Sequence, residues 1–167
     1  WIKSSGSTGT NEGILYKDDA VNRSYKMQIM GSGVNDEKLN FALFNGGTVF
    51  HTYGTSNLFD DNWHHVVAVY TPSTSVVLYV DGVLETNNTS SVPASIDNDP
   101  ADFEIGRKGD GSLWFVGNIS NGAVWNSALS AANVLSIYNN GRPADLTSLS
   151  PVAWWRLGEN ASFDGSD

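Results

Sequence analysis

The sequence predicts an all-β protein, built as a sandwich or a barrel, with one short helix. Apolar and polar residues mostly alternate over short segments, which is the pattern of half-buried strands. Turn-forming residues recur about every 8–12 positions, the spacing typical of sandwiches and barrels. Charged residues are only 16% of the 167, so Asn, Ser, Thr and Gly must supply much of the polar surface, as in β proteins with many turns.

The expected strands are short and are bounded by Gly, Asn, Asp, Pro and Thr. Asn45-Gly46 and Asp81-Gly82 mark two tight hairpins, because type I′ turns need positive φ at both central residues. The longest irregular segment is expected at 86–100. Strands are expected at 13–17, 24–30, 38–44, 49–53, 64–71, 75–80, 83–86, 102–106, 113–125 and 152–157.

Two adjacent histidines lie in the stretch 60–85, which could be a metal site or a sheet framework. His64 and His65 fall in one expected strand, so their side chains leave opposite faces and cannot bind one ion together. Both faces of this strand are apolar, which indicates a central strand of a sandwich. His64 shares one face with Val66, Ala68 and Tyr70, and His65 shares the other with Trp63, Val67 and Val69.

One helix is expected after residue 130. Ser130 can cap its first turn, and Leu129 just before the cap has the spacing of a hydrophobic staple with Val134. So short a helix is not stable alone, and we expect it to cover a sheet edge or one end of the sandwich. Val134, Leu135 and Tyr138 form the expected apolar stripe of this helix, and Gly141 is its expected left-handed stop.

Charge and composition exclude several kinds of partner. The net charge is -9, whereas a duplex-binding protein needs a basic face, so neither nucleic acid nor an anionic membrane surface is expected. No apolar run approaches the ~18 residues of a membrane helix, so membrane insertion is not expected. Cysteine is absent, which excludes disulfides and thiolate chemistry. The acidity instead suits a hard cation such as calcium.

Residues 60–141 carry an ordered set of motifs. They are Trp63-His64-His65-Val66-Val67, Leu78-Tyr79-Val80-Asp81-Gly82, Ile105-Gly106, Phe115-Val116-Gly117-Asn118-Ile119, Ala123-Val124-Trp125-Asn126, Ala128-Leu129-Ser130 and Tyr138-Asn139-Asn140-Gly141. In this order they resemble the laminin-G-like, or concanavalin A-like lectin/glucanase, domains. The resemblance implies an all-β, two-sheet antiparallel jelly-roll β-sandwich. It also implies glycan binding, adhesion or a structural role in secreted and viral proteins, often with one calcium ion.

The same resemblance predicts the domain limits. Residues 1–157 are expected to form one jelly-roll domain that lacks the opening strand of the family, and 158–167 a linker or the start of a next unit. Because 163–167 resemble that opening strand, we expect the chain to be one unit of a longer array. The chain begins with Trp1 rather than Met, and we expect it to continue a longer protein.

A polar loop near residue 110 is the candidate ligand site. Sugars lay their C–H faces against aromatic rings, and Trp114 is the best surface candidate among the tryptophans. Arg107 and Asp110 lie on the same loop and suit a carboxylated sugar or an acidic protein. The alternative is a solvated hairpin tip. Three other tryptophans are expected in the core: Trp63, Trp125 and Trp155.

An acidic loop is the candidate calcium site. Asp97, Asp99 and Asp102 could pool carboxylate oxygens for one calcium ion, although their spacing is not that of an EF-hand. The alternative is that these residues form turns, since Asp bonds its own backbone.

These observations favour a non-catalytic binding or adhesion module, located extracellularly, on a cell surface or on a virion surface. Its expected partner is a glycan or a cell-surface polymer, bound by loops at one rim and strengthened by repetition along an array. The alternative is a structural decoration or spacer domain of a filament, capsid or tail assembly, in contact with neighbouring subunits or tandem copies. An enzyme is not expected, because Asp102 and Glu104 lack the run of carboxylates that a glucanase carries.

Overall fold

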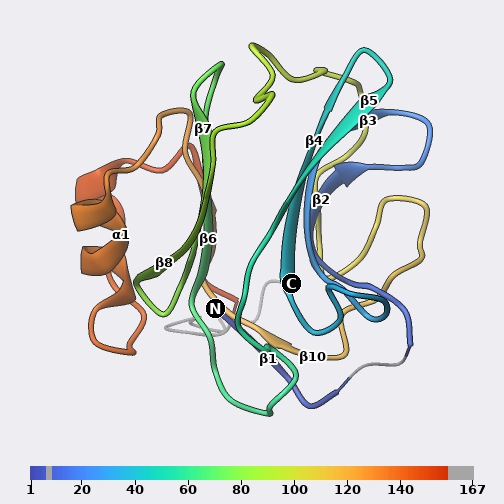
Figure 1. Cartoon of the computed structure of the whole chain (residues 1–167). Coiled ribbons are helices and arrows are strands. Elements are labelled where there is room, and N and C mark those ends of the chain that lie inside the picture. Colours follow the sequence, from blue (N-terminus) through green and yellow to red (C-terminus); the bar gives the residue numbers. More distant parts are fainter. Residues whose placement is uncertain (7–8, 158–167) are drawn as a thin grey trace, which may run out of the picture.

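The structure is a sandwich of two antiparallel sheets, which confirms the predicted fold class (Figure 1). This computed structural model describes residues 1–6 and 9–157. The larger sheet contains, in spatial order, β5 (Thr48–Tyr53), β4 (Leu39–Asn45), β3 (Arg23–Ile29), β2 (Glu12–Asp18) and β9 (Glu104–Ile105). The smaller sheet contains β6 (Val66–Thr71), β7 (Ser75–Val80) and β8 (Val83–Asn88).

Two short ribbons lie beside the sheets. One pairs β1 (Ile2–Ser4) with β10 (Gly117–Ile119), and the other pairs β11 (Gly122–Val124) with β12 (Ala153–Trp155). The remaining elements are α1 (Ala131–Tyr138) and a 3₁₀ turn at Thr147–Leu149.

Most strands form where the sequence predicts them, but the expected strand at 113–125 divides in two. Asn121, between β10 and β11, has a φ of 49°, a left-handed conformation that interrupts an extended strand. Two other expected strands are shorter than predicted: 102–106 contains only β9, and 152–157 contains only β12.

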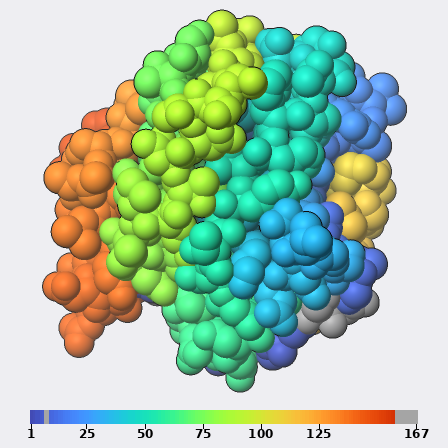
Figure 2. Space-filling view, viewed as in Figure 1, coloured from blue at the N-terminus to red at the C-terminus, as the bar shows by residue number. Residues whose placement is uncertain are grey.

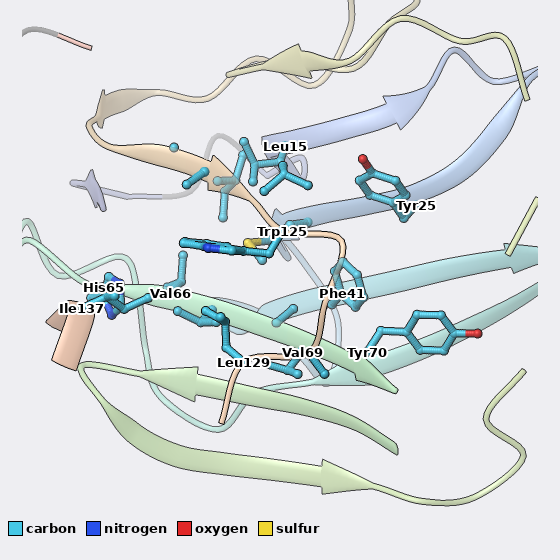
Figure 3. A pocket seen from close by; sticks show the side chains of 18 of the residues that line it. Leu15, Tyr25, Phe41, His65, Val66, Val69, Tyr70, Trp125, Leu129 and Ile137 are labelled. Atoms are coloured by element: carbon cyan, nitrogen blue, oxygen red, sulfur yellow. The ribbon is translucent and has the colours of Figure 1, made fainter. Parts of the chain in front are cut away.

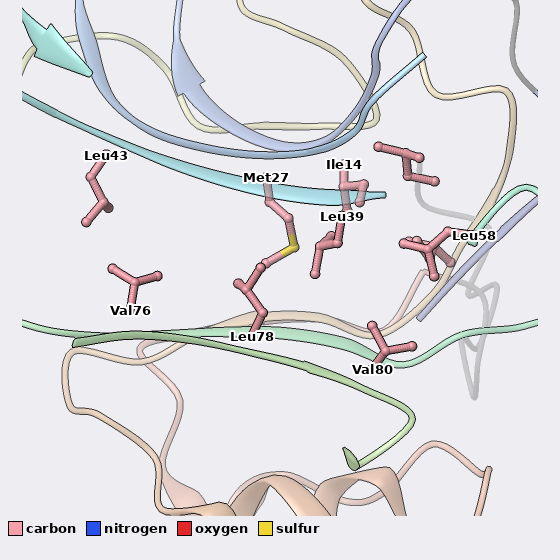
Figure 4. Packing of buried hydrophobic residues seen from close by; sticks show 10 residues of the cluster. Ile14, Met27, Leu39, Leu43, Leu58, Val76, Leu78 and Val80 are labelled. Carbon is pink, nitrogen blue, oxygen red and sulfur yellow. The ribbon is translucent and has the colours of Figure 1, made fainter. Parts of the chain in front are cut away.

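The main core lies between the two sheets (Figure 4). Met27, Leu39 and Leu43 of the larger sheet face Val76 and Leu78 of the smaller one, and all of these side chains are buried. Alternation along each strand brings them to the inner face. The sheets also meet directly at one side, where Thr86 Oγ1 donates to the Tyr53 carbonyl at 2.7 Å, and the surface there is closed (Figure 2).

The Asp81-Gly82 hairpin is confirmed, and the other predicted hairpin turns one residue later. Asp81 and Gly82 have φ of 51° and 76°, as a type I′ turn requires. Asn45 instead pairs with Thr48, so the central residues of the second turn are Gly46 and Gly47, with φ of 56° and 81°. Asn45 is held in the strand because its Nδ2 bonds Ser95.

Helix α1 covers the outer face of the smaller sheet, which corrects the expectation that it covers an edge or an end (Figure 1). Its cap is confirmed: the Ser130 hydroxyl accepts from the Asn133 N–H, and Asn133 bonds back. Val134 packs against Val69 and Tyr79 of the sheet. The second buried residue of the helix is Ile137, whereas Leu135, expected in the apolar stripe, is exposed. The helix ends at Asn139, which has a left-handed conformation, before it reaches the expected stop at Gly141.

The prediction that Trp63 belongs to the core is wrong, because 45% of this residue is exposed. Trp63 lies before β6, in the segment that leads into the strand. Alternation within β6 therefore does not determine which way the Trp63 side chain points. Trp125 is half-buried and donates to the Leu149 carbonyl at 3.1 Å. Trp155 is half-buried and stacks on Phe103, with ring centroids 5.0 Å apart.

The two histidines lie on opposite faces, as predicted, and have opposite environments. His64 Nδ1 bonds Asp81 at 2.8 Å and its Nε2 bonds Asp60 at 3.1 Å. The bond to Asp81, opposed by burial and helped by the bond to Asp60, raises the pKa of His64. His65 packs between Trp1 and Tyr138, and burial lowers its pKa to about 4.

Leu78→Ala should lower the free energy of unfolding by about 2–5 kcal/mol, because Leu78 is fully buried between the sheets and its removal leaves a cavity. The control, Val83→Ala, changes a side chain that is 66% exposed and should stay within about 0.5 kcal/mol of the natural chain. Urea denaturation measures both. Equal losses in the two variants would contradict this assignment of the core.

His64 should stabilise the fold as a cation. Because its pKa is raised on folding, the stabilisation is fully present below the unfolded pKa of about 6.5 and is lost as pH rises through the raised folded value. The free energy of unfolding of the natural chain and of His64→Gln should therefore differ most at acidic pH. Both proteins keep His65, whose lowered pKa gives the opposite pH dependence, so the difference isolates His64. A difference that grows toward alkaline pH would be the opposite of this expectation.

Candidate functional site: a rim loop with an exposed tryptophan

The predicted ligand residues lie on one loop between β9 and β10, at residues 106–116. Backbone hydrogen bonds fix both ends of this loop: Phe115 N–H donates to the Gly106 carbonyl at 2.8 Å, and Gly13 N–H of β2 donates to the Leu113 carbonyl at 2.8 Å. A side chain at Gly13 would meet the Leu113 carbonyl oxygen at 2.8 Å, so glycine is needed for this close approach. The loop is thus attached to the larger sheet.

The structure brings Arg107 and Trp114 together. The guanidinium carbon of Arg107 lies 5.3 Å from the centre of the Trp114 ring, within the range of a cation–π contact. Glu104 binds the same guanidinium through two hydrogen bonds, from Nε and Nη2, both at 3.0 Å. This pairing lowers the pKa of Glu104. Trp114 is 59% exposed. We call Glu104, Arg107 and Trp114 the rim site.

Asp110 lies at the tip of the same loop and is engaged there. Its carboxylate accepts from Lys108 Nζ at 2.7 Å and from the Ser112 N–H at 3.0 Å. These bonds, that of Lys108 first, hold the pKa of Asp110 at about 2. Asp110 therefore shapes the loop. Its described hydrogen bonds go to Lys108 and Ser112, and none goes to Arg107 or Trp114.

The candidate calcium ligands bond the protein itself. The Asp97 carboxylate accepts from the Gly46 N–H at 3.0 and 3.1 Å, and Asp99 Oδ2 accepts from the Arg23 N–H at 2.9 Å. Asp102 is exposed. Within 1–6 and 9–157, no group of three or more His, Cys, Asp or Glu side chains is arranged to hold a metal ion.

A lysine already neutralises this acidic loop. Lys17 Nζ donates to the carbonyls of Asp99 and Ala101, at 2.5 and 3.0 Å. Carbonyl oxygens of this kind are the ligands that calcium uses, so the ammonium group takes the position of a cation. The contacts of Asp97, Asp99 and Lys17 therefore do not fit a calcium site built on these residues.

Two features were missed by the reasoning from sequence. One is a row of polar side chains on the outer face of the larger sheet: Tyr16 donates to Gln28, Gln28 to Asn40 at 3.0 Å, and Asn40 contacts His51 at 3.3 Å. The alternation of Lys26 and Gln28 with apolar residues in β3 was the available signal. The other is an apolar cavity of about 540 Å³ between β6 and β11 (Figure 3), for which the sequence carries no direct signal.

The fold has a counterpart among solved structures. A heptameric SAP-like pentraxin from Limulus polyphemus is similar over 82% of this chain and 66% of its own, with 16% identity and a TM-score of 0.61. An S-layer domain-containing protein (residues 221–444) from Clostridium thermocellum is matched over 83% of this chain and 66% of its own, with 17% identity and a TM-score of 0.42. The chain thus spans slightly less than two thirds of each.

A search of curated proteins finds no match. No helix in the described part of the chain has the length and apolar character to cross a membrane. Residues 1–135 match the model of the concanavalin A-like lectin/glucanases superfamily, of the laminin G type. The chain therefore belongs to this family of jelly-roll domains.

Proposed function

We propose that the domain is a non-catalytic binding module that recognises a glycan or another cell-surface polymer through the rim site. The observation that carries this proposal is the exposed Trp114 ring, held by Arg107 on a loop that is attached to a sheet. Family membership supports a binding module in general. The pentraxin resembles it in fold alone.

The rim site has the physical properties that sugar binding needs. With the guanidinium against one face of Trp114, the exposed area of the ring is left for the C–H face of a sugar. Arg107 is fixed by Glu104 through a two-bond fork, so little side-chain freedom is lost on binding. The guanidinium of Arg107 beside the ring can select carboxylate or hydroxyl groups, and Asp110, at the tip of the same loop, offers a further acceptor for hydroxyl groups.

The carboxylates support a non-catalytic role. A glycosidase needs one carboxylic acid with a raised pKa beside a second carboxylate. Glu104 is paired with Arg107, and its pKa is lowered instead. Glu12 has a raised pKa because of burial, but it is fully buried and bonds Ser4 at 3.0 Å, out of reach of a polymer.

A single rim site of this size binds weakly, and repetition would strengthen it. Linked copies convert later binding events into intramolecular ones, which raises avidity without new contacts. This suits a module exposed outside the cell, on a cell surface or on a virion, facing a polymer that repeats the same sugar. Tandem copies or neighbouring subunits would supply the repetition.

One surface favours a second candidate function, a spacer or decoration domain that contacts other protein subunits. Val83, Leu84 and Leu135 are 66%, 52% and 58% exposed. Leu84 and Leu135 share the helix side of the smaller sheet, because Leu84 pairs with Tyr79, which packs against the helix. Val83 pairs with the core residue Val80 and faces the other side. Exposed apolar groups that lie together mark protein contact surfaces. Self-association that is lost in Leu135→Glu, without any glycan binding, would favour this function over the first.

Trp114→Ala should reduce the glycan-array signal of the domain by about tenfold or more, since truncation of an aromatic anchor removes most of a small site's binding energy. Trp63→Ala is the matched control, because Trp63 is also exposed, at 45%, but lies on a different loop. It should keep the natural signal. A glycan signal that survives Trp114→Ala, or that falls equally in both variants, would place the binding site elsewhere.

Lys17→Met should lower the free energy of unfolding by about 1–3 kcal/mol, because the carbonyls of Asp99 and Ala101 lose their donor. Lys38→Met, just before β4, is the control. Millimolar calcium should leave the melting temperature of the natural chain unchanged. A calcium-dependent rise that disappears in an Asp97→Asn, Asp99→Asn double variant would instead support the calcium site predicted from the sequence.

A further inference from the structure

The outer face of the larger sheet carries a straight row of side chains that runs from β2 to β5. Strand pairing places Tyr16 of β2 opposite Lys26 of β3. Lys26 lies opposite Ala42 of β4, and Ala42 lies opposite His51 of β5. The sequence neighbours of these residues pack in the core, so alternation turns the row outward. Ala42 is nevertheless fully buried, because longer side chains beside it cover it. An amine and an imidazole therefore flank one small residue.

The amino group of Lys26 has no counter-ion. In the described part of the chain it makes no hydrogen bond and no ion pair, whereas Lys108 bonds Asp110 at 2.7 Å. Lys26 Nζ instead lies 5.9 Å from the ring centre of Tyr16 and 5.9 Å from that of Phe44. Lys26 is half-buried, and burial without a carboxylate partner favours the neutral amine over the ammonium ion.

Two neighbouring cations act in the same direction as burial. Burial lowers the pKa of Lys26; the charge of Asp18 opposes this effect, and the charges of Lys108 and Arg23 add to it. Nucleophilic lysines in proteins are activated by desolvation or by an adjacent cation, and Lys26 has both. Its Nζ is not among the fully enclosed polar atoms of the described residues, so small molecules can reach it.

His51 provides a proton carrier at the end of the same row. Its ring is held in place, because Nδ1 contacts Asn40 Nδ2 at 3.3 Å and the ring stacks on Tyr53, with centroids 5.6 Å apart. Burial lowers the pKa of His51, and the charge of Lys26 lowers it further, so the imidazole is neutral at pH 7. A neutral imidazole beside an amine can take up a proton and return it.

We propose that Lys26 is a covalent modification site for small aldehydes, including the open-chain form of reducing sugars, and that His51 carries the proton of the reaction. The site uses none of the residues of the rim site, so it does not depend on the proposed function.

The chemistry is the formation of an imine. The neutral Nζ of Lys26 donates its electron pair to the carbonyl carbon, a C–N bond forms, and the carbonyl oxygen takes up a proton. His51 accepts the proton that the nitrogen loses and returns it to the hydroxyl group, which leaves as water. One amine and one aldehyde thus give one imine and one water, and neither an oxidant nor a reductant is needed.

The test treats the natural chain at pH 7 with glycolaldehyde and cyanoborohydride, which reduces each imine as it forms, and follows every lysine by peptide mass spectrometry. Lys26 should be labelled about tenfold faster than Lys38, because more of its amine is neutral. Lys38 is the control amine, since it lies just before β4 and makes no cation–π contact in the described structure. In concentrated urea the two rates should become equal, because the fold creates the difference.

His51→Gln tests the proton carrier. It should slow imine formation at Lys26 by about tenfold or more. Acetylation of Lys26 by acetic anhydride needs only the neutral amine, so its rate should stay unchanged in this variant, which shows that the fold and the amine are intact.

The natural chain alone can overturn the proposal. Labelling of Lys26 no faster than Lys38 would do so, and so would a preference for Lys26 that persists in urea, because local sequence would then explain it. An equal rate of imine formation in His51→Gln and in the natural chain would overturn the role of His51.

Discussion

Burial of both faces of the three-stranded sheet is the constraint on which the rest of the structure depends. Val76, Leu78 and Val80 face the larger sheet across the main core. Val69 and Tyr79 face outward, where Val134 of the helix covers them. A sheet that is apolar on both faces needs two covering layers, so the short helix is part of the framework.

Features set by neighbouring residues could be predicted from the sequence, and features set by distant contacts could not. The strand pattern, the Asp81-Gly82 turn and the Ser130 cap each depend on a few adjacent residues, and the structure confirms them. The exposure of Trp63 was missed because alternation describes a strand and says nothing of the residue before it. The split at Asn121 was missed although Asn121-Gly122 is a turn-forming pair, because the prediction covers the whole of 113–125 with one strand.

The candidate sites show the same division. The sequence identifies Arg107 and Trp114 as surface residues of one loop, but not that the guanidinium stacks on the ring. In the acidic loop, Asp97 and Asp99 look like free carboxylates in the sequence. Their backbone partners, and the ammonium of Lys17, come from strands and turns far away along the chain. Charge pattern alone therefore predicts an open cation site where the fold has placed a lysine.

The proposed function uses the rim site for recognition, whereas the faces of the sheets serve packing and internal hydrogen bonds. Amide chemical-shift mapping during titration with a mixture of oligosaccharides tests this division most directly. We expect the shifts to be concentrated in residues 104–116, around Trp114 and Arg107. Shifts concentrated instead on the polar outer row, around Asn40 and His51, would contradict it and would assign binding to the face of the larger sheet.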